Sequence, residues 1–314
     1  MTQYIIRRLI YSLFIIWGCA TIVFFMLRLV PGDPVANILG IEYTPEAAAQ
    51  LRHNLGLDKP IYEQYAIWMG GVAHGDLGKS IDTRQSVAHD IVKAFPKTLS
   101  ITILAFLFGV IVSVPLGVLA ALRRGSVFDF VASSTTFIGI SLPPFWFGIV
   151  FILIFAVQFR WFPSVGYVPP SEGIWPWLKH LILPALAAGV GEVAILMRFV
   201  RAGLLDVLGS DYIRTARAKG LRERGVIFSH AMRNAMIPVT TVAGLSLAGL
   251  LGGLVITETV FAISGIGRLL VNSIFAKDYP IVQGVILLIT LFFVLSNLVV
   301  DILYTFLDPR IRYG

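Results

Sequence analysis

Long runs without a charged residue recur along the chain. A charge at the centre of a bilayer costs roughly 2.5–3.5 kcal/mol on insertion scales, so such runs are the main signal of membrane spans. A helix needs roughly 18–20 residues to cross a hydrocarbon core of about 30 Å. Five runs meet that length: 9–27, 98–122, 130–159, 234–257 and 279–300.

A sixth candidate, 180–197, is interrupted only by Glu192. The longest run contains Pro143 and Pro144, and because proline disfavours helix at the residue before it, we expect a kink near Leu142 within one bent span. The sequence therefore predicts an all-α membrane protein with six transmembrane helices. With flanking residues included, we expect these helices at about 9–29, 98–122, 130–159, 180–200, 236–257 and 279–300.

Lysines and arginines lie mainly on one side of these spans. Fourteen of them flank or connect the spans on that side, eight in the loop 198–233, whereas the short loops of the other side carry four. The region from Pro31 to Lys97 is set aside, because the positive-inside rule applies to short loops. The rule predicts that both termini and the loop 198–233 are cytoplasmic.

Small residues recur at four-residue spacing in two of the spans. In lipid, such stripes let helix backbones approach closely, so these two spans are expected inside a helical bundle. The first predicted span has bulky residues and no such stripe, so we expect it to face lipid. The stripes are Gly109, Ser113, Gly117 and Ala121 in one span, and Gly244, Ala248 and Gly252 in the other, with Gly249 and Gly253 beside them.

Composition agrees with a membrane protein and gives catalysis little support. Hydrophobic residues make up 57% and charged residues 14%, against roughly 45–50% and 25% in soluble domains. Cys19 is the single cysteine, and the five histidines lack ligand spacing, so no metal site is predicted. Gly78-Lys79-Ser80 looks like the end of a nucleotide-binding loop, but that pattern requires a glycine where Ala73 stands. We expect no catalytic residue and no nucleic-acid partner.

Glu192 is an ionisable residue at the depth of the bilayer. Such residues are rare in spans and are by default functional, as a proton relay, a solute contact or a pairing site. The alternatives are a structural hydrogen bond to a neighbouring helix, or a span that begins later in the chain. The sequence leaves these readings open.

The loop 203–237 contains a predicted short helix. Ser210 is a plausible N-cap, and Asp211 lies at the positive end of the helix dipole. Residues 212–219 contain no helix breaker, and Gly220 suits a C-terminal cap in the left-handed conformation. A second helical stretch is expected over about 223–236. A short isolated helix is marginal in water, so this one needs a docking surface, either lipid head groups or a soluble partner.

The segment DYIRTARAKG followed by RNAMIP resembles the cytoplasmic loop of permease subunits of binding-protein-dependent ABC importers, in the dipeptide, oligopeptide and glutathione branch. Further segments of that branch follow in order through nearly the whole chain: RRL near the start, VPGDP (30–34), LGLDKP (55–60), HGDLGKS (74–80), TETVF (257–261), GIGRLL (265–270), KDYPIVQG (277–284) and DPRIR (308–312). The family's Glu-Ala-Ala is replaced here by Arg214-Thr215-Ala216, so its acidic residue is absent.

The resemblance implies the type I fold of ABC importer transmembrane domains. It implies an N-terminal helix with a long periplasmic region over 1–93, and a permease domain over 94–307. In this family the loop forms a coupling helix that docks on an ATPase subunit. Carried over to this sequence, the coupling residues are Asp211, Arg214, Thr215, Ala216, Arg217, Ala218, Lys219 and Gly220. Ala216 and Ala218 are expected to be small enough for close approach to the ATPase.

The resemblance also implies the partners and the cargo. It implies a non-catalytic subunit of the bacterial inner membrane, in contact with lipid, a second permease, two ATPase subunits that hold ATP and Mg²⁺, and a periplasmic solute-binding protein. The outer segments from Pro31 to Lys97, 160–179 and 265–278 are expected to face that binding protein. Peptides are the expected substrate, with glutathione or nickel complexes as alternatives. An ion-coupled secondary transporter that uses Glu192 is a further alternative.

Overall fold

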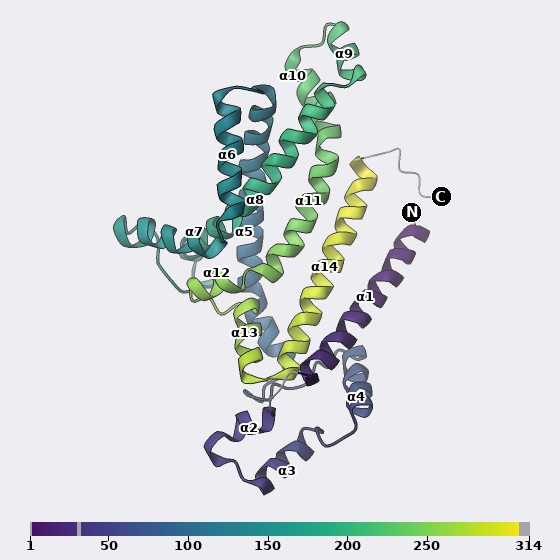
Figure 1. The fold of residues 1–314 in the computed structure, drawn as a ribbon, viewed down its shortest axis with the longest axis vertical. Helices are drawn as coiled ribbons and strands as arrows, with labels where there is room; N and C mark the ends of the chain where they lie inside the picture. The colour runs from purple at the N-terminus through teal and green to yellow at the C-terminus, as the bar shows by residue number, and fades with distance from the viewer. Residues whose placement is uncertain (1, 30–32, 308–314) are drawn as a thin grey trace. The chain divides into compact units, whose positions relative to one another are not determined.

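The computed structural model describes residues 2–29 and 33–307, and almost all of them are helical (Figure 1). The segments VPGDP, in part, and DPRIR lie outside these residues. A bent pair of helices supplies a sixth crossing if it counts as one span. The predicted all-α class with up to six spans is therefore confirmed. Five helices are long and apolar enough to cross a membrane: Ile6–Leu29, Val87–Leu122, Ile174–Leu208, Glu223–Gly253 and Tyr279–Val300.

The helices belong to two compact units. Unit 1 comprises Lys97–Ile263 and the described part of Phe292–Gly314, and unit 2 comprises Thr2–Pro96 and Ser264–Leu291. Two long helices contribute to both units: α5 (Val87–Leu122) and α14 (Tyr279–Leu307). Unit 1 further contains α6 (Val127–Ser141), α7 (Pro144–Phe151), a π-helix (Ile152–Gln158), a 3-10 turn (Pro170–Glu172), α8 (Ile174–Leu208), α9 (Asp211–Ala218), α10 (Glu223–Gly225), a second π-helix (Val226–Ala231), α11 (Met232–Gly253) and α12 (Val255–Val260). Unit 2 further contains α1 (Thr2–Leu29), α2 (Pro34–Leu39), a 3-10 turn (Gly40–Glu42), α3 (Pro45–Asn54), α4 (Ile61–Ala73) and α13 (Ile266–Ala276).

The long helix α8 is the centre of unit 1. Its apolar window is 61% buried, more than that of any other candidate span, while the window of α1 is only 11% buried. The contact between α8 and α5 requires glycine at residue 117 of α5. A Cβ there would lie 2.8 Å from the side chain of Val200 in α8. Gly109 and Gly117 both face α8, and Ser113 and Ala121 are buried. The first predicted stripe is therefore a packing surface.

The second predicted stripe and the two glycines predicted beside it lie in different environments, and Gly252 of the stripe is itself exposed. Gly244 packs against Val300 of α14, and Ala248 is buried. Gly249 and Gly253 lie on the exposed side of α11, and a Cβ there would meet no atom within 4 Å. One face of α11 therefore packs inside unit 1 and its neighbouring face does not.

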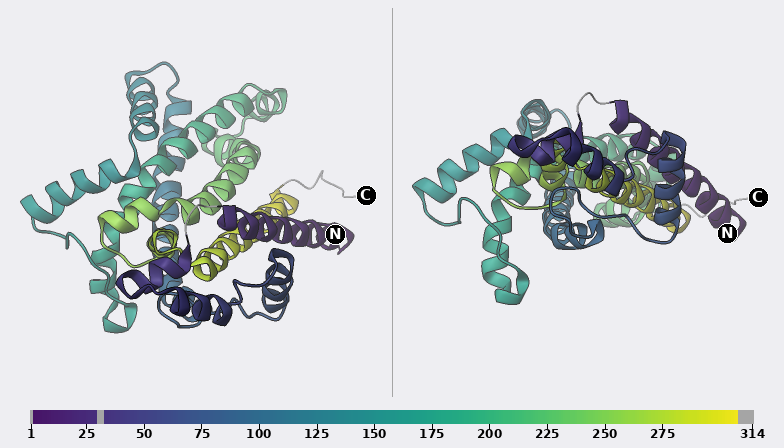
Figure 2. Two further views of the ribbon diagram at one scale, coloured as in Figure 1. Left: turned by 60° about the horizontal axis from the view of Figure 1, so that its bottom comes forward. Right: turned by 90° about the horizontal axis from the view of Figure 1, so that it is seen from below.

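The predicted break at Leu142 is confirmed, and it is much sharper than a kink. Leu142 is extended (φ −93°, ψ 134°), and Pro143 precedes the first residue of α7. The axis of α6 and that of the helix over Pro144–Gln158 differ by 101°. Figure 2 shows this arm extending sideways from the α6–α8 bundle. Two consecutive prolines remove backbone donors and restrict the preceding residues, so the chain turns here instead of bending gradually.

The helices also differ in length from the predicted spans. α5 begins at Val87 instead of residue 98, because Lys93 and Lys97 interrupt the uncharged run without ending the helix. The predicted span 236–257 is divided at Leu254, where α11 ends and α12 begins. The uncharged runs therefore identify the apolar part of each helix, but they do not locate the ends of the helix.

Unit 2 is held by a buried carboxylate. Asp278, only 2% exposed, accepts hydrogen bonds from the Ser80 hydroxyl at 2.5 Å and from the backbone amides of Ile81 at 3.1 Å and Ile281 at 3.4 Å. One acceptor thereby caps the start of α14 and fixes the loop before α5. The segments HGDLGKS and KDYPIVQG, far apart in sequence, meet at this carboxylate.

Replacing Gly117 by alanine tests the packing of α5 on α8. A methyl group there would lie 2.8 Å from Val200 and 2.9 Å from the Met197 carbonyl oxygen, and overpacking typically costs about 1–3 kcal/mol. We expect a lower melting temperature for the purified protein in detergent. Gly18→Ala is the matched control, since no atom lies within 4 Å of a Cβ there. Equal melting temperatures for the two variants would contradict this packing.

Candidate functional site

The short helix α9 lies beyond the adjacent ends of α8 and α11, at the tip of unit 1 (Figure 1). Ser210 precedes it in the extended conformation expected of an N-cap (φ −76°, ψ 152°). Its hydroxyl does not cap α9, because it donates to the Val207 carbonyl oxygen at 2.6 Å. Ser210 therefore occupies the predicted N-cap position, but its side chain does not form the predicted hydrogen bond to the first turn of α9.

Two apolar residues hold α9 on the bundle. Ile213 is fully buried and Ala216 is 8% exposed. They face a cluster contributed by α5, α8 and the helices from Val226 onward: Val118, Ala121, Leu196, Val200, Leu204, Val226, Ala231, Ala235 and Val239. Ala216 thus packs inside its own chain, which corrects the expectation that it faces outward, whereas Ala218 is exposed.

Sequence reasoning missed Ile213. It precedes Ala216 by three residues, the spacing of one face of a helix. That apolar face, inside an otherwise charged segment, was the signal that would have found it.

The remaining predicted coupling residues form an exposed polar face. Asp211 and Arg214 lie 3.5 Å apart, and the Thr215 hydroxyl donates to the Asp211 carbonyl oxygen at 3.0 Å. Arg217 is exposed in the last turn, and Lys219, the residue that follows the helix, is exposed as well. The structure brings these residues together on the side of α9 that points away from its own chain.

The turn after α9 needs a left-handed residue. Gly220 has φ +75°, as predicted, and its amide donates to the Arg217 carbonyl oxygen at 2.9 Å. Across this turn the Arg217 guanidinium contacts both carboxylate oxygens of Glu223, at 2.7 and 3.2 Å. Hydrogen bonding to Glu223 raises the pKa of Arg217 above its usual value. Tyr212 is tied to α11 by a hydrogen bond from the Asn234 amide at 2.7 Å.

The two helices that carry α9 touch at the backbone. A Cβ at Gly203 of α8 would lie 2.8 Å from the Ala235 carbonyl oxygen of α11. This close approach lies at the base of the loop, next to the cluster that buries Ile213. Both long helices are therefore in close contact at the point where α9 is attached.

Glu192 lies between three helices. Its Cβ is 2.9 Å from the position of a Cβ on Gly109 of α5, and its carboxylate lies close to Ser246 of α11. Its second oxygen, Oε2, is buried and has no hydrogen-bond partner among the described residues. Glu192 therefore lies where it can pair with a neighbouring helix, and Ser246 is the polar side chain nearest to that role.

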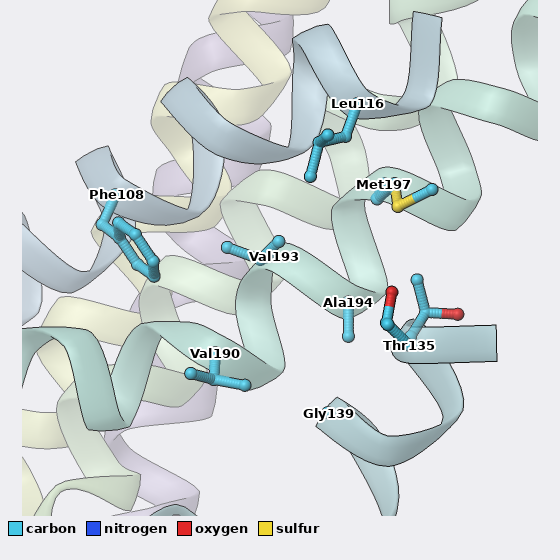
Figure 3. Close-up of a pocket in the computed structure, with 9 residues that line it drawn as sticks. Phe108, Leu116, Thr135, Gly139, Val190, Val193, Ala194 and Met197 are labelled. Carbon is cyan, nitrogen blue, oxygen red and sulfur yellow. The ribbon is translucent and has the colours of Figure 1, made fainter. Parts of the chain in front are cut away.

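A cavity of about 170 Å³ lies between α5, α6 and α8 (Figure 3). Its lining is mostly apolar, with Phe108 and Leu116 from α5 and Val190, Val193 and Met197 from α8. Within the described ranges, no three His, Cys, Asp or Glu side chains are grouped so that they could hold a metal ion.

Comparison with known proteins identifies the family. Residues 113–313 match the model described as binding-protein-dependent transport system inner membrane component, and residues 1–102 match its N-terminal companion. The chain belongs to this family. It is a multi-pass inner-membrane subunit of a transport system that depends on a binding protein. The resemblance inferred from the loop segments is confirmed.

Full-length relatives carry closely related names. A probable peptide ABC transporter permease of Sinorhizobium fredii is 42% identical over 313 residues, covering 100% of both chains. The di/tripeptide transport system permease protein DppB of Pseudomonas aeruginosa is 41% identical, covering 100% of this chain and 99% of its own. The dipeptide transport system permease protein DppB of Escherichia coli is also 41% identical, with 100% and 99% covered.

A solved structure shares the fold. The inward-facing MetNI methionine ABC transporter aligns with a TM-score of 0.57 at 20% identity, covering 70% of this chain and 96% of that chain. The chain therefore has the type I ABC importer transmembrane fold predicted from the sequence.

Shortening Ile213 tests the attachment of α9. We expect Ile213→Ala to release α9, because deletion of buried isoleucine atoms costs about 2–5 kcal/mol. Tryptic cleavage after Arg214, Arg217 or Lys219 should accelerate by about tenfold or more, since roughly 1.4 kcal/mol is a factor of ten. Thr215→Ser, on the exposed face, is the control. Unchanged cleavage of Ile213→Ala would show that α9 is held by other contacts.

A second prediction concerns Glu192. Glutamine keeps the shape of the side chain and can hydrogen bond to Ser246, and it removes the charge of a carboxylate whose Oε2 has no partner among the described residues. We expect Glu192→Gln to melt at the same or a higher temperature, while Glu192→Val, which loses the hydrogen bond, melts lower. A large loss of stability in Glu192→Gln would show that the charge itself stabilises the fold, which contradicts this expectation.

Proposed function

We propose that the chain is the permease subunit of an ATP-driven importer of peptides, either di- and oligopeptides or glutathione-like compounds. The observation that carries this proposal is similarity over the whole chain, at 41–42% identity, to proteins named as peptide and dipeptide permeases. Nickel complexes are not favoured as cargo, because the relatives are named as peptide and dipeptide permeases. The ion-coupled alternative that uses Glu192 is not favoured, because these relatives are permeases of ABC systems.

In this proposal the chain performs no catalysis. Two partner ATPase subunits hold ATP and Mg²⁺, and a second, similar permease completes the path. The exposed face of α9 docks on one ATPase, and closure of the ATPases moves α9. Burial of Ile213 and the backbone contact at Gly203 support transmission to α8 and α11. Such coupling requires contacts that differ between the two ATPase states.

The same proposal assigns the sides of the membrane. Both termini and the loop that carries α9 are cytoplasmic, in line with the distribution of lysine and arginine. The region up to Lys97 and the segments 160–179 and 265–278 face the periplasm, where a solute-binding protein docks. The boundary near residue 93, between the N-terminal region and the permease domain, is part of this assignment.

The turn at Gly220 provides the test. Valine at φ +75° is strained by about 1–3 kcal/mol, so Gly220→Val should lower peptide-stimulated ATP hydrolysis and uptake roughly 5- to 150-fold in proteoliposomes that hold the assembled transporter. Gly225→Val is the matched control, since Gly225 has φ −66° and open space around its Cβ position.

Co-purification of the ATPase subunits with each variant separates loss of assembly from loss of coupling. If Gly220→Val assembles normally and transports at the wild-type rate, the coupling role of this turn is wrong. If the chain alone accumulates peptide in liposomes without nucleotide, the importer assignment itself is wrong.

A further inference from the structure

We propose that the groove between α6 and α8, near the end of unit 1 that carries α9, binds one anionic phospholipid. Arg198 would hold the lipid phosphate, and an acyl chain would lie along the apolar surface beyond it. The assignment to the cytoplasmic leaflet rests on the orientation given under the proposed function, whereas the binding itself does not.

The polar end of the groove is a cavity of about 380 Å³ with Arg198 in its wall. The guanidinium of Arg198 lies 5.6 Å from the centroid of the Phe137 ring. Among the described residues, Arg198 has no carboxylate partner. A guanidinium binds phosphate through several donors at once, and an aromatic ring beneath it leaves these donors available at its edge.

The neighbouring arginine is already occupied. Arg201 contacts both carboxylate oxygens of Asp129, at 2.6 and 2.8 Å, and the Gly125 amide binds the same carboxylate at 3.0 Å. That ion pair is locally neutral. The charge of Arg198 is therefore uncompensated, and the exposed Arg123 and Arg124 precede α6 at the same end of the helix pair.

The depth of Arg198 suits a head group. Ser126 caps the start of α6, and Asp129 lies in its first turn. Arg198 is three residues from Arg201, about 4.5 Å further along α8 at 1.5 Å per residue. A long arginine side chain at this depth reaches the polar surface of a bilayer while its stem stays apolar.

The apolar end of the groove continues from the polar end. Thr136 borders both cavities, and beyond it lie Val193 and Met197 of α8 (Figure 3). Phe137 and Phe199, beside the arginine, are 62% and 43% exposed. A single cation followed by apolar surface matches an anionic amphiphile. A peptide would also need an acceptor for its amino group, and no Asp or Glu is among the described residues that line either cavity.

Native mass spectrometry of the assembled transporter tests the proposal. The complex is equilibrated with equal amounts of phosphatidylglycerol and phosphatidylcholine, and retained lipids are counted after mild detergent washing. We expect the wild type to retain phosphatidylglycerol preferentially, and Arg198→Gln to lower this retention at least fivefold. Arg124→Gln removes an exposed charge outside the groove and should change retention less than twofold. Equal retention by wild type and Arg198→Gln would overturn the proposal.

Three further arms distinguish the other occupants. Arg198→Lys keeps the positive charge but loses the paired donors of the guanidinium, so we expect intermediate retention of phosphatidylglycerol. This variant replaces Arg198→Gln if the latter does not assemble. Inorganic phosphate and a dipeptide are added as competitors. Displacement of phosphatidylglycerol by the dipeptide, or loss of peptide uptake in Arg198→Gln with unchanged lipid retention, would assign the groove to cargo and overturn the proposal. Failure of uptake in the wild type would affect the proposed function and not this lipid measurement.

Discussion

Burial of Ile213 is the contact on which the functional reading of the structure depends. A helix of eight residues is marginal by itself, so α9 exists because its apolar face is covered. The covering residues belong to the ends of α8 and α11 and to α5. The same contact stabilises α9 and joins it to the bundle, and the proposed coupling to an ATPase requires both. Weakening the contact should decouple the loop before it unfolds the spans.

Buried polar groups supply the remaining long-range ties. Asp129 binds Arg201, 72 residues away, and the Thr98 hydroxyl donates to Glu258 at 2.5 Å, 160 residues away. Asp278 joins the loop before α5 to the start of α14 within unit 2. In each tie one partner lies within about one turn of a helix end: Asp129 in the first turn of α6, Glu258 in the short α12 and Asp278 just before α14. Apolar packing allows helices to slide, whereas a directional bond between charged or hydroxyl groups fixes where along the helices they meet.

Much of the fold and part of the candidate site were predictable from local patterns. Uncharged length identified the spans, paired prolines identified the break at Leu142, and glycine at residue 220 identified a left-handed turn. These features depend on a few adjacent residues. The backbone and solvation energies that cause them are the same in any protein. The exposed charged face of α9 was predictable for the same reason.

The neighbours of each helix were decided only by tertiary structure. Glycine stripes looked alike in α5 and α11, yet Gly117 packs on Val200 while Gly249 faces open space. Ala216 and Ala218 looked equivalent, yet only Ala216 is buried. Sequence spacing states which residues share a face, because the period of the helix is fixed. Which face is covered depends on side chains from distant parts of the chain. A local sequence pattern does not contain that information.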